Sequence, residues 1–201
     1  QASRDAFQQA AAFNWGQARF RVRGLDNEYG TTFINGISMN KIFDGRPQYS
    51  NWGGLNDATR NQEFINGSMP NDYTFGGILG VQAINTRASF MRTGTRASLS
   101  GTNTNYNGRV MLTHASGMNK NGWAYAASAS YRMANQGFFE GTDYDAKSFF
   151  LAIEKKINNN HSLNLSAIYA QNSRGKNSPN TQEVIDLMGY KYNSDDVLEN
   201  E

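Results

Sequence analysis

Two histidines, His114 and His161, are the side chains of this chain best suited to proton transfer or metal binding near neutral pH. They lie far apart in the sequence, without the spacing of a metal site. Cysteine is absent, which excludes thiolate nucleophiles and cysteine-ligated zinc. The phosphate-loop, serine-hydrolase and metalloprotease motifs are also missing. We therefore expect no enzymatic activity, no cofactor and no metal ion, and interpret the histidines as a strand residue and a turn residue.

A stretch rich in glycine and aromatic residues, between residues 39 and 55, offers a different chemistry. Its aromatic and charged side chains form a candidate ligand-binding set: Phe43, Asp44, Arg46, Tyr49 and Trp52. Aromatic surfaces with a few polar groups suit the recognition of a solute. The same side chains could instead pack against another part of the protein, and the sequence leaves both interpretations open.

The first 90 residues contain short elements interrupted by glycine. The expected elements are a helix over 3–13, strands over 19–23, 31–34 and 81–86, and a second helix over 57–64. Ser3 suits the cap of the first helix. Asn35 and Gly36 form an Asn-Gly pair, the strongest short signal for a β-hairpin. This part of the chain is therefore expected to mix short helices with short strands.

After residue 90 the pattern changes to long alternating segments. Five strands are expected, over 92–102, 106–117, 122–134, 145–157 and 161–171. Their lengths suit tilted strands that cross a membrane. The clearest is the third, in which small or polar residues alternate with one largely apolar set: Trp123, Tyr125, Ala127, Ala129, Tyr131 and Met133. Such alternation with interfacial aromatic residues is typical of a lipid-facing strand.

The links between these strands differ in length. Short links at 117–121 and 158–160 alternate with a longer link at 135–144 and a long tail from residue 172, although the link at 103–105 is also short. Outer-membrane barrels have short periplasmic turns and longer outer loops. If the first strand rises from the periplasm, the turns at 117–121 and 158–160 lie on the periplasmic side. Alternation alone fits a soluble β-sandwich equally well.

Four segments of the first part form an ordered set. They are FRVRG at 20–24, FINGI at 33–37, a glycine-bounded stretch at 67–76 and LGVQAINTR at 79–87. In order and spacing they resemble the plug domain of TonB-dependent outer-membrane receptors. The residues that carry this plug signature are Arg23, Gly24, Asn35, Gly36, Gly67, Phe75, Gly76 and Gly80. The segment 105–193 is similar to receptors from the Bacteroidetes.

The resemblance implies a chain of two parts. Residues 1–90 would be the C-terminal part of the plug, a small α+β unit of short strands and helices. Residues 91–201 would be the start of an antiparallel transmembrane β-barrel, with roughly five strands and an outer loop. The implied function is energy-coupled uptake of a solute across the outer membrane of a Gram-negative cell. The implied partners are the TonB energy complex, reached through a segment missing from this chain, the outer-membrane lipid, and a small solute, glycan or peptide.

Two positions depart from the family pattern. Asn35 stands where many members have Asp, and Asn66 stands before Gly67 where many members have Arg. A plug arginine that pairs with barrel carboxylates therefore cannot be assigned at position 66.

Composition adds two expectations. The formal net charge of +2 gives no reason to expect a nucleic-acid partner. No apolar run approaches the ~18 residues of a transmembrane helix. The alternative to a receptor is a soluble β-rich binding or adhesion module, in which Trp123, Tyr131 and Leu165 would be buried.

Overall fold

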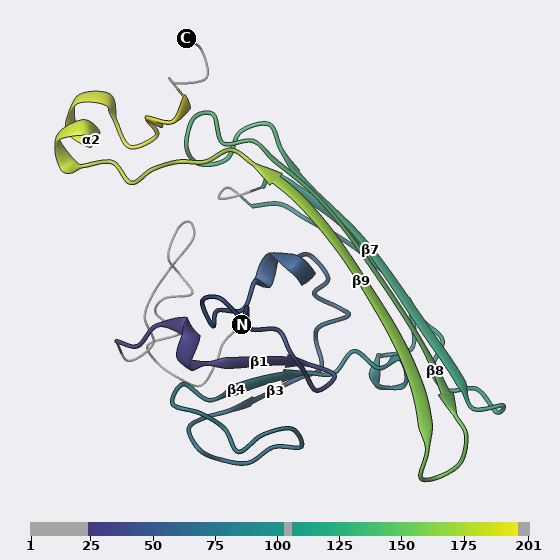
Figure 1. Cartoon of the computed structure of the whole chain (residues 1–201). Coiled ribbons are helices and arrows are strands. Elements are labelled where there is room, and N and C mark those ends of the chain that lie inside the picture. The colour runs from purple at the N-terminus through teal and green to yellow at the C-terminus, as the bar shows by residue number, and fades with distance from the viewer. Residues whose placement is uncertain (1–23, 103–105, 197–201) are drawn as a thin grey trace.

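The strands of this chain form two sheets. A computed structural model describes residues 24–102 and 106–196; the helix expected over 3–13 and the strand over 19–23, with Arg23, lie outside these ranges. The smaller sheet has the order β2-β1-β4-β3 and the larger sheet the order β5-β6-β7-β8-β9. The larger sheet is long and curved, and the smaller sheet lies on its concave side (Figure 1). The architecture is mostly β with few helices, and the antiparallel strands expected after residue 90 form the larger sheet.

The smaller sheet contains the predicted hairpin. Its strands are β1 (Thr31–Ile34), β2 (Ile37–Ser38), β3 (Gln62–Ile65) and β4 (Val81–Ile84). Asn35 and Gly36 connect β1 to β2 with φ angles of 50° and 85°, and two positive φ angles are the requirement of a tight type I′ turn. β4 pairs with β1 in parallel and with β3 in antiparallel orientation. The strand expected over 31–34 is thus confirmed, and the strand expected over 81–86 forms but ends at Ile84.

The helix predicted over 57–64 is wrong. A single turn forms, in which the amide of Thr59 donates to the carbonyl of Leu55 at 3.0 Å, and the chain then enters β3. The backbone hydrogen bonds of this segment are formed with β4, a strand that follows much later in the sequence. Tertiary pairing therefore overrides a weak local preference for helix.

Gly76 and Gly80 let the chain pass close to the segment 65–69. Their φ angles are 87° and 80°, in the left-handed region that favours glycine. A Cβ atom on Gly76 would overlap the carbonyl oxygen of Gly67, and one on Gly80 would overlap that of Ile65. Both positions thus require glycine for its φ angle and for its lack of a side chain.

Replacing Gly80 with alanine will lower the free energy of unfolding by about 3 kcal/mol or more, because left-handed backbone strain is joined by a backbone collision. Gly67→Ala is the matched control. Its φ is 65° but nothing lies within 4 Å of the added Cβ, so only the strain of about 1–2 kcal/mol is expected. Urea denaturation of the complete protein, followed by tryptophan fluorescence, measures both. Equal effects of the two variants would show that close packing at Gly80 contributes nothing.

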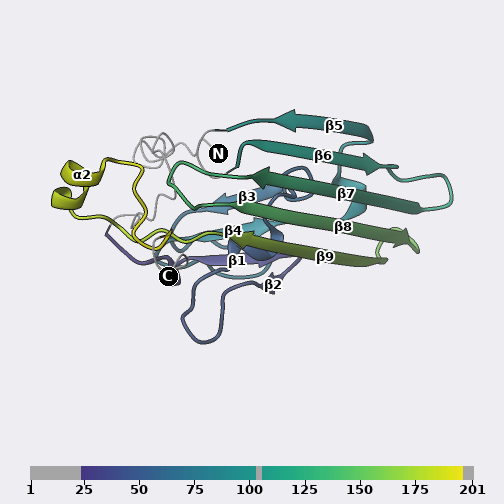
Figure 2. The same ribbon diagram turned by 90° about the horizontal axis from the view of Figure 1, so that it is seen from above.

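The larger sheet is an antiparallel meander (Figure 2). Its strands are β5 (Gly94–Ser100), β6 (Gly108–Ala115), β7 (Trp123–Ala134), β8 (Tyr144–Lys156) and β9 (Ser162–Arg174). All five strands expected after residue 90 are present, and β9 continues three residues beyond the predicted end at 171. The links β6–β7 and β8–β9 share one end of the sheet, because neighbouring strands alternate in direction.

The other end of the larger sheet carries the β7–β8 link and the tail. The tail contains α2 (Gln182–Met188), a helix that the sequence analysis did not predict. Asn193 fixes the tail to the link, since its Nδ2 donates to the carbonyls of Glu140 and Lys176 at 2.8 and 2.9 Å. None of the helices in the described ranges has the length and apolar character needed to cross a membrane.

The core lies between the two sheets. On the concave side, side chains of β6 to β8 pack against residues of the first part in one cluster: Leu55, Ala58, Ala88, Met91, Ala115, Ala124, Ala126, Phe150 and Ala152. A second cluster joins Ile34, Trp52 and Ile84, with Ile168 of β9 packed against it. We call the concave side of β5–β9 the inner face and the convex side the outer face.

Candidate functional site

A buried ion pair links the two sheets. Glu154 on the inner face of β8 is only 2% exposed, and its carboxylate pairs with the guanidinium of Arg87, in the segment after β4. The same carboxylate accepts a hydrogen bond from the amide of Ser89 at 3.1 Å. Arg87 also donates to the hydroxyl of Ser162 at the start of β9. A buried carboxylate with several donors is a strong, oriented contact, so it fixes the segment after β4 to the larger sheet.

Asn35, the hairpin residue of the plug signature, contributes a second polar contact. Its Oδ1 accepts from the amide of Thr86 at 2.8 Å, and its Nδ2 donates to the Thr86 hydroxyl at 2.8 Å. The same Nδ2 lies 3.5 Å from the hydroxyl of Ser166 on β9. An aspartate could accept the first of these bonds and could also accept from the two hydroxyl groups, so the geometry suits either residue at this position.

Asp57 connects the first part to β5. Its carboxylate pairs with Arg96 at 3.0 Å and with Arg60 at 2.9 Å. Asp57 is buried, whereas Arg60 is exposed. Arg96 on the inner face is therefore paired with a carboxylate that it shares with Arg60.

The loop between β2 and η2 (Tyr49–Trp52) is organised by Asn40. Its Oδ1 accepts from the amide of Thr32 at 2.9 Å. Its Nδ2 donates to the carbonyls of Gly30 and Gly45 at 2.7 and 2.6 Å. These three hydrogen bonds of the Asn40 side chain hold both ends of the loop tip against β1. The candidate binding residues therefore belong to an ordered loop.

The structure separates the five candidate binding residues into two groups. Phe43, Asp44 and Arg46 lie at the loop tip, where Phe43 is exposed. Tyr49 and Trp52 contact each other edge to face, with ring centroids 5.5 Å apart. Trp52 is buried in the cluster that contains Ile34 and Ile84, so it packs between the sheets, whereas Tyr49 is exposed. A role in ligand binding stays a prediction for all five.

Charges at the loop tip are paired. The Lys41 ammonium lies 2.6 Å from the Asp44 carboxylate, and this hydrogen bond holds the pKa of Asp44 below its ordinary value of 3.8. Asp44 is therefore ionised at neutral pH. The Arg46 guanidinium lies 3.7 Å from the carboxylate of Asp26.

Gly53 and Gly54, which follow η2, touch the inner face of the larger sheet. The Ser148 hydroxyl donates to the carbonyl of Gly53 at 2.6 Å. A Cβ on Gly54 would lie 2.8 Å from the Ser130 hydroxyl and 3.0 Å from Nε of Arg132. The loop that carries the candidate binding residues therefore ends against Arg132. Sequence reasoning missed this residue, although an arginine at an inward position of the clearest strand was a usable signal.

The remaining plug-signature residues have different positions. Gly24 and Gly67 have positive φ angles and open space around them, and Phe75 is exposed. His114 lies on the outer face beside Tyr125, and His161 lies in the β8–β9 link. The described ranges contain no group of three or more His, Asp or Glu side chains that could hold a metal ion.

Comparison of this chain with protein-family models, with curated proteins and with solved structures finds no match in any of the three.

Proposed function

We propose that this chain is part of a TonB-dependent outer-membrane receptor. In this proposal the unit built on β1–β4 belongs to the plug, and β5–β9 belong to the wall of a transmembrane barrel. One observation carries the proposal: the larger sheet has an exposed apolar outer face and an inner face covered by the first part of the chain.

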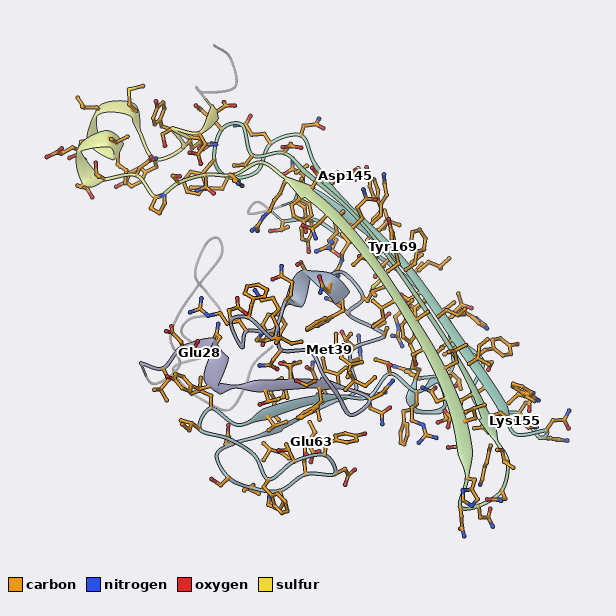
Figure 3. All side chains as sticks on the ribbon, in the orientation of Figure 1. Glu28, Met39, Glu63, Asp145, Lys155 and Tyr169 are labelled. Atoms are coloured by element: carbon orange, nitrogen blue, oxygen red, sulfur yellow. The ribbon has the colours of Figure 1, made fainter. Side chains whose placement is uncertain are left out.

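The outer face supports contact with lipid. Exposed apolar and aromatic side chains alternate along its strands: Leu99, Val110, Leu112, Trp123, Tyr125, Tyr131, Met133, Phe149, Leu151, Ile153, Leu163, Leu165 and Tyr169. In Figure 3, Tyr169 and Lys155 point away from the smaller sheet, whereas Met39 lies between the sheets. So large an apolar surface is unusual on a protein surrounded by water.

The ends of this apolar band also fit a membrane. The Lys155 ammonium lies 4.9 Å from the ring centroid of Trp123, and that of Lys147 lies 5.7 Å from the ring centroid of Tyr131. Positions 147 and 155 are separated on β8 by about 27 Å at ~3.4 Å per residue, close to the ~25 Å band of outer-membrane barrels before strand tilt is considered. Aromatic residues and lysines at both borders are typical of membrane interfaces.

The inner face supports the presence of a plug. Where β6 to β8 meet the first part, their inward side chains are mostly small or polar, including Ser128, Ser130 and Ser148. The contacts across this boundary include the Arg87–Glu154 pair and the Ser148–Gly53 hydrogen bond. Polar contacts of this kind can exchange with water when a plug is remodelled, and they lie beside the apolar cluster around Leu55 and Phe150 at the same boundary.

In this proposal the complete receptor binds a solute outside the cell, and energy passed through TonB remodels the plug to release the solute inward. The TonB contact would use a segment upstream of this chain. The soluble binding or adhesion module, the alternative, requires Trp123, Tyr131 and Leu165 to be buried. They are exposed by 45%, 37% and 67%, which favours the receptor.

Brominated lipids, which quench tryptophan fluorescence on contact, test the lipid-facing wall. The complete gene product in vesicles of brominated phosphatidylcholine should lose fluorescence relative to the same vesicles without bromine. In a Trp15→Phe background, Trp123→Phe should remove much of that difference, because Trp123 lies on the outer face and Trp52, the other tryptophan of this chain, is buried. An unchanged difference in Trp123→Phe, or a protein that is monomeric in buffer without detergent, would reject the proposal.

A further inference from the structure

Two arginines face each other on the inner face without a counter-charge. Arg109 of β6 and Arg132 of β7 are direct partners across the strands, and both occupy inward positions. Within residues 24–102 and 106–196, no carboxylate forms an ion pair with either guanidinium. Like charges directly opposite each other destabilise a sheet. We therefore expect the combined positive charge of Arg109 and Arg132 to have a function that offsets this cost to stability.

The arrangement contrasts with that of Arg96, another inward arginine of this sheet. Arg96 of β5 pairs with the carboxylate of Asp57 at 3.0 Å, and this contact gives it a structural role. Arg109 instead donates from Nε to the hydroxyl of Ser100 at 3.1 Å, a neutral partner. At positions 109 and 132, by contrast, two guanidinium groups lie opposite each other without a carboxylate partner among the described residues.

The first part of the chain holds Arg132 in place. Its Nε is buried beside Gly54 without a hydrogen-bond acceptor among the described residues. Its guanidinium lies 5.4 Å from the ring centroid of Tyr144. Packing on both sides, rather than an acceptor, orients this side chain. An oriented guanidinium loses little freedom when it binds a ligand.

Two tyrosines add an aromatic surface beside the pair. Tyr106 and Tyr144 lie with ring centroids 6.2 Å apart, and Tyr144 is the ring that faces Arg132. Arg132 is two residues from the end of β7, on the side of the sheet that carries the β7–β8 link and the tail. In the receptor proposed above, this is the side that faces the outside.

We propose that Arg109 and Arg132 form an anion-binding subsite, and that the solute carries a carboxylate or phosphate group beside a part that packs on tyrosine. Guanidinium groups bind such oxyanions through paired, charge-assisted hydrogen bonds. The assignment of the anion to a transported solute rests on the proposed receptor function. Anion binding itself does not.

Calorimetric titration of the complete protein in detergent, in buffer of low chloride, tests this subsite with inorganic phosphate and with citrate as the probes. The double variant Arg109→Gln/Arg132→Gln should weaken binding of the preferred probe at least about tenfold, as expected for the loss of charge-assisted hydrogen bonds. Arg96→Gln, which removes an equal but paired charge from the same face, should change binding less than about twofold. Arg132→Lys should give an intermediate loss. The probe that binds more tightly shows whether the subsite prefers a phosphate or a carboxylate group.

Thermal unfolding separates a ligand site from a structural one. Without added anion, the double variant should melt at the same temperature as the wild type or higher, because like-charge repulsion is removed. Phosphate or citrate should raise the midpoint of the wild type but not that of the double variant. Absence of binding by both probes, an equal loss in Arg96→Gln, or a lower midpoint of the double variant without anion would overturn the subsite. Binding that depends on the pair in a chain that is monomeric without detergent would support the subsite and reject the receptor.

Discussion

Replacing Leu151 with arginine will destabilise the protein in a bilayer by about 2–4 kcal/mol, the cost measured for arginine at the midplane of outer-membrane barrels. Leu151 lies in the middle of the outer face, and its partners across the strands are Ala127 and Ala167. An arginine there has no nearby charge on this face to pair with and must reach a distant interface through lipid. Urea titration of the complete protein in phosphatidylcholine vesicles measures the change.

Gln171→Arg is the matched control for this experiment. Gln171 lies on the same face of β9, opposite Lys147, at the border of the apolar band. Arginine near an interface costs about 0–1 kcal/mol, so the two variants should differ clearly. On a water-exposed face, both substitutions would stay within about 0.5 kcal/mol. Similar small effects of Leu151→Arg and Gln171→Arg would therefore contradict a lipid-facing wall.

Replacing Arg87 with glutamine will weaken the attachment of the first part of the chain to β8. The change leaves the carboxylate of Glu154 buried without its cation. Removing only one partner of a buried ion pair is strongly destabilising, because the remaining charge is not compensated. We expect a loss of at least about 2 kcal/mol, below the upper end for buried pairs because the Arg87 side chain is 34% exposed. The amide of Ser89 donates to the same carboxylate, so its hydrogen exchange reports the local opening.

The double variant Arg87→Gln/Glu154→Gln removes both charges and should recover much of that loss, because no buried charge stays unpaired. Arg60→Gln is the control for a surface pair. Its partner Asp57 keeps Arg96, so the expected effect is below about 1 kcal/mol. A double variant as unstable as Arg87→Gln would show that hydrogen bonding or packing, and not buried charge, dominates this contact.

Local sequence signals predicted the strands well. The alternation around Trp123 and Tyr131 marks β7, and the Asn-Gly pair at 35–36 marks the β1–β2 turn, because both signals depend on a few neighbouring residues. The helix expected over 57–64 failed because β3 is stabilised by a partner strand that follows much later in the chain. α2 was missed although Thr181 accepts a capping hydrogen bond from the amide of Val184 at 3.5 Å.

The candidate site could be predicted only in part. The aromatic loop was recognisable from composition, yet the burial of Trp52 depends on Ile168, which lies far along the sequence. The arginine pair was not predictable, because its alignment depends on the register set by the link between β6 and β7. A shift of one residue in that link would place one guanidinium on the outer face. Long-range packing and register are the two properties that a pattern of residue types does not encode directly.

The two sheets differ in how far apart their paired strands lie along the chain, and this difference has a consequence for folding kinetics. β7 and β8 meet through the pair Ala134–Tyr144, whereas β1 and β4 must join Thr31 to Val81. Closing the longer loop costs about 1.4 kcal/mol more in chain entropy. We therefore expect the hairpins of the larger sheet to form early and the parallel β1–β4 pair to close late. The inner face would then be the template on which the first part of the chain completes its folding.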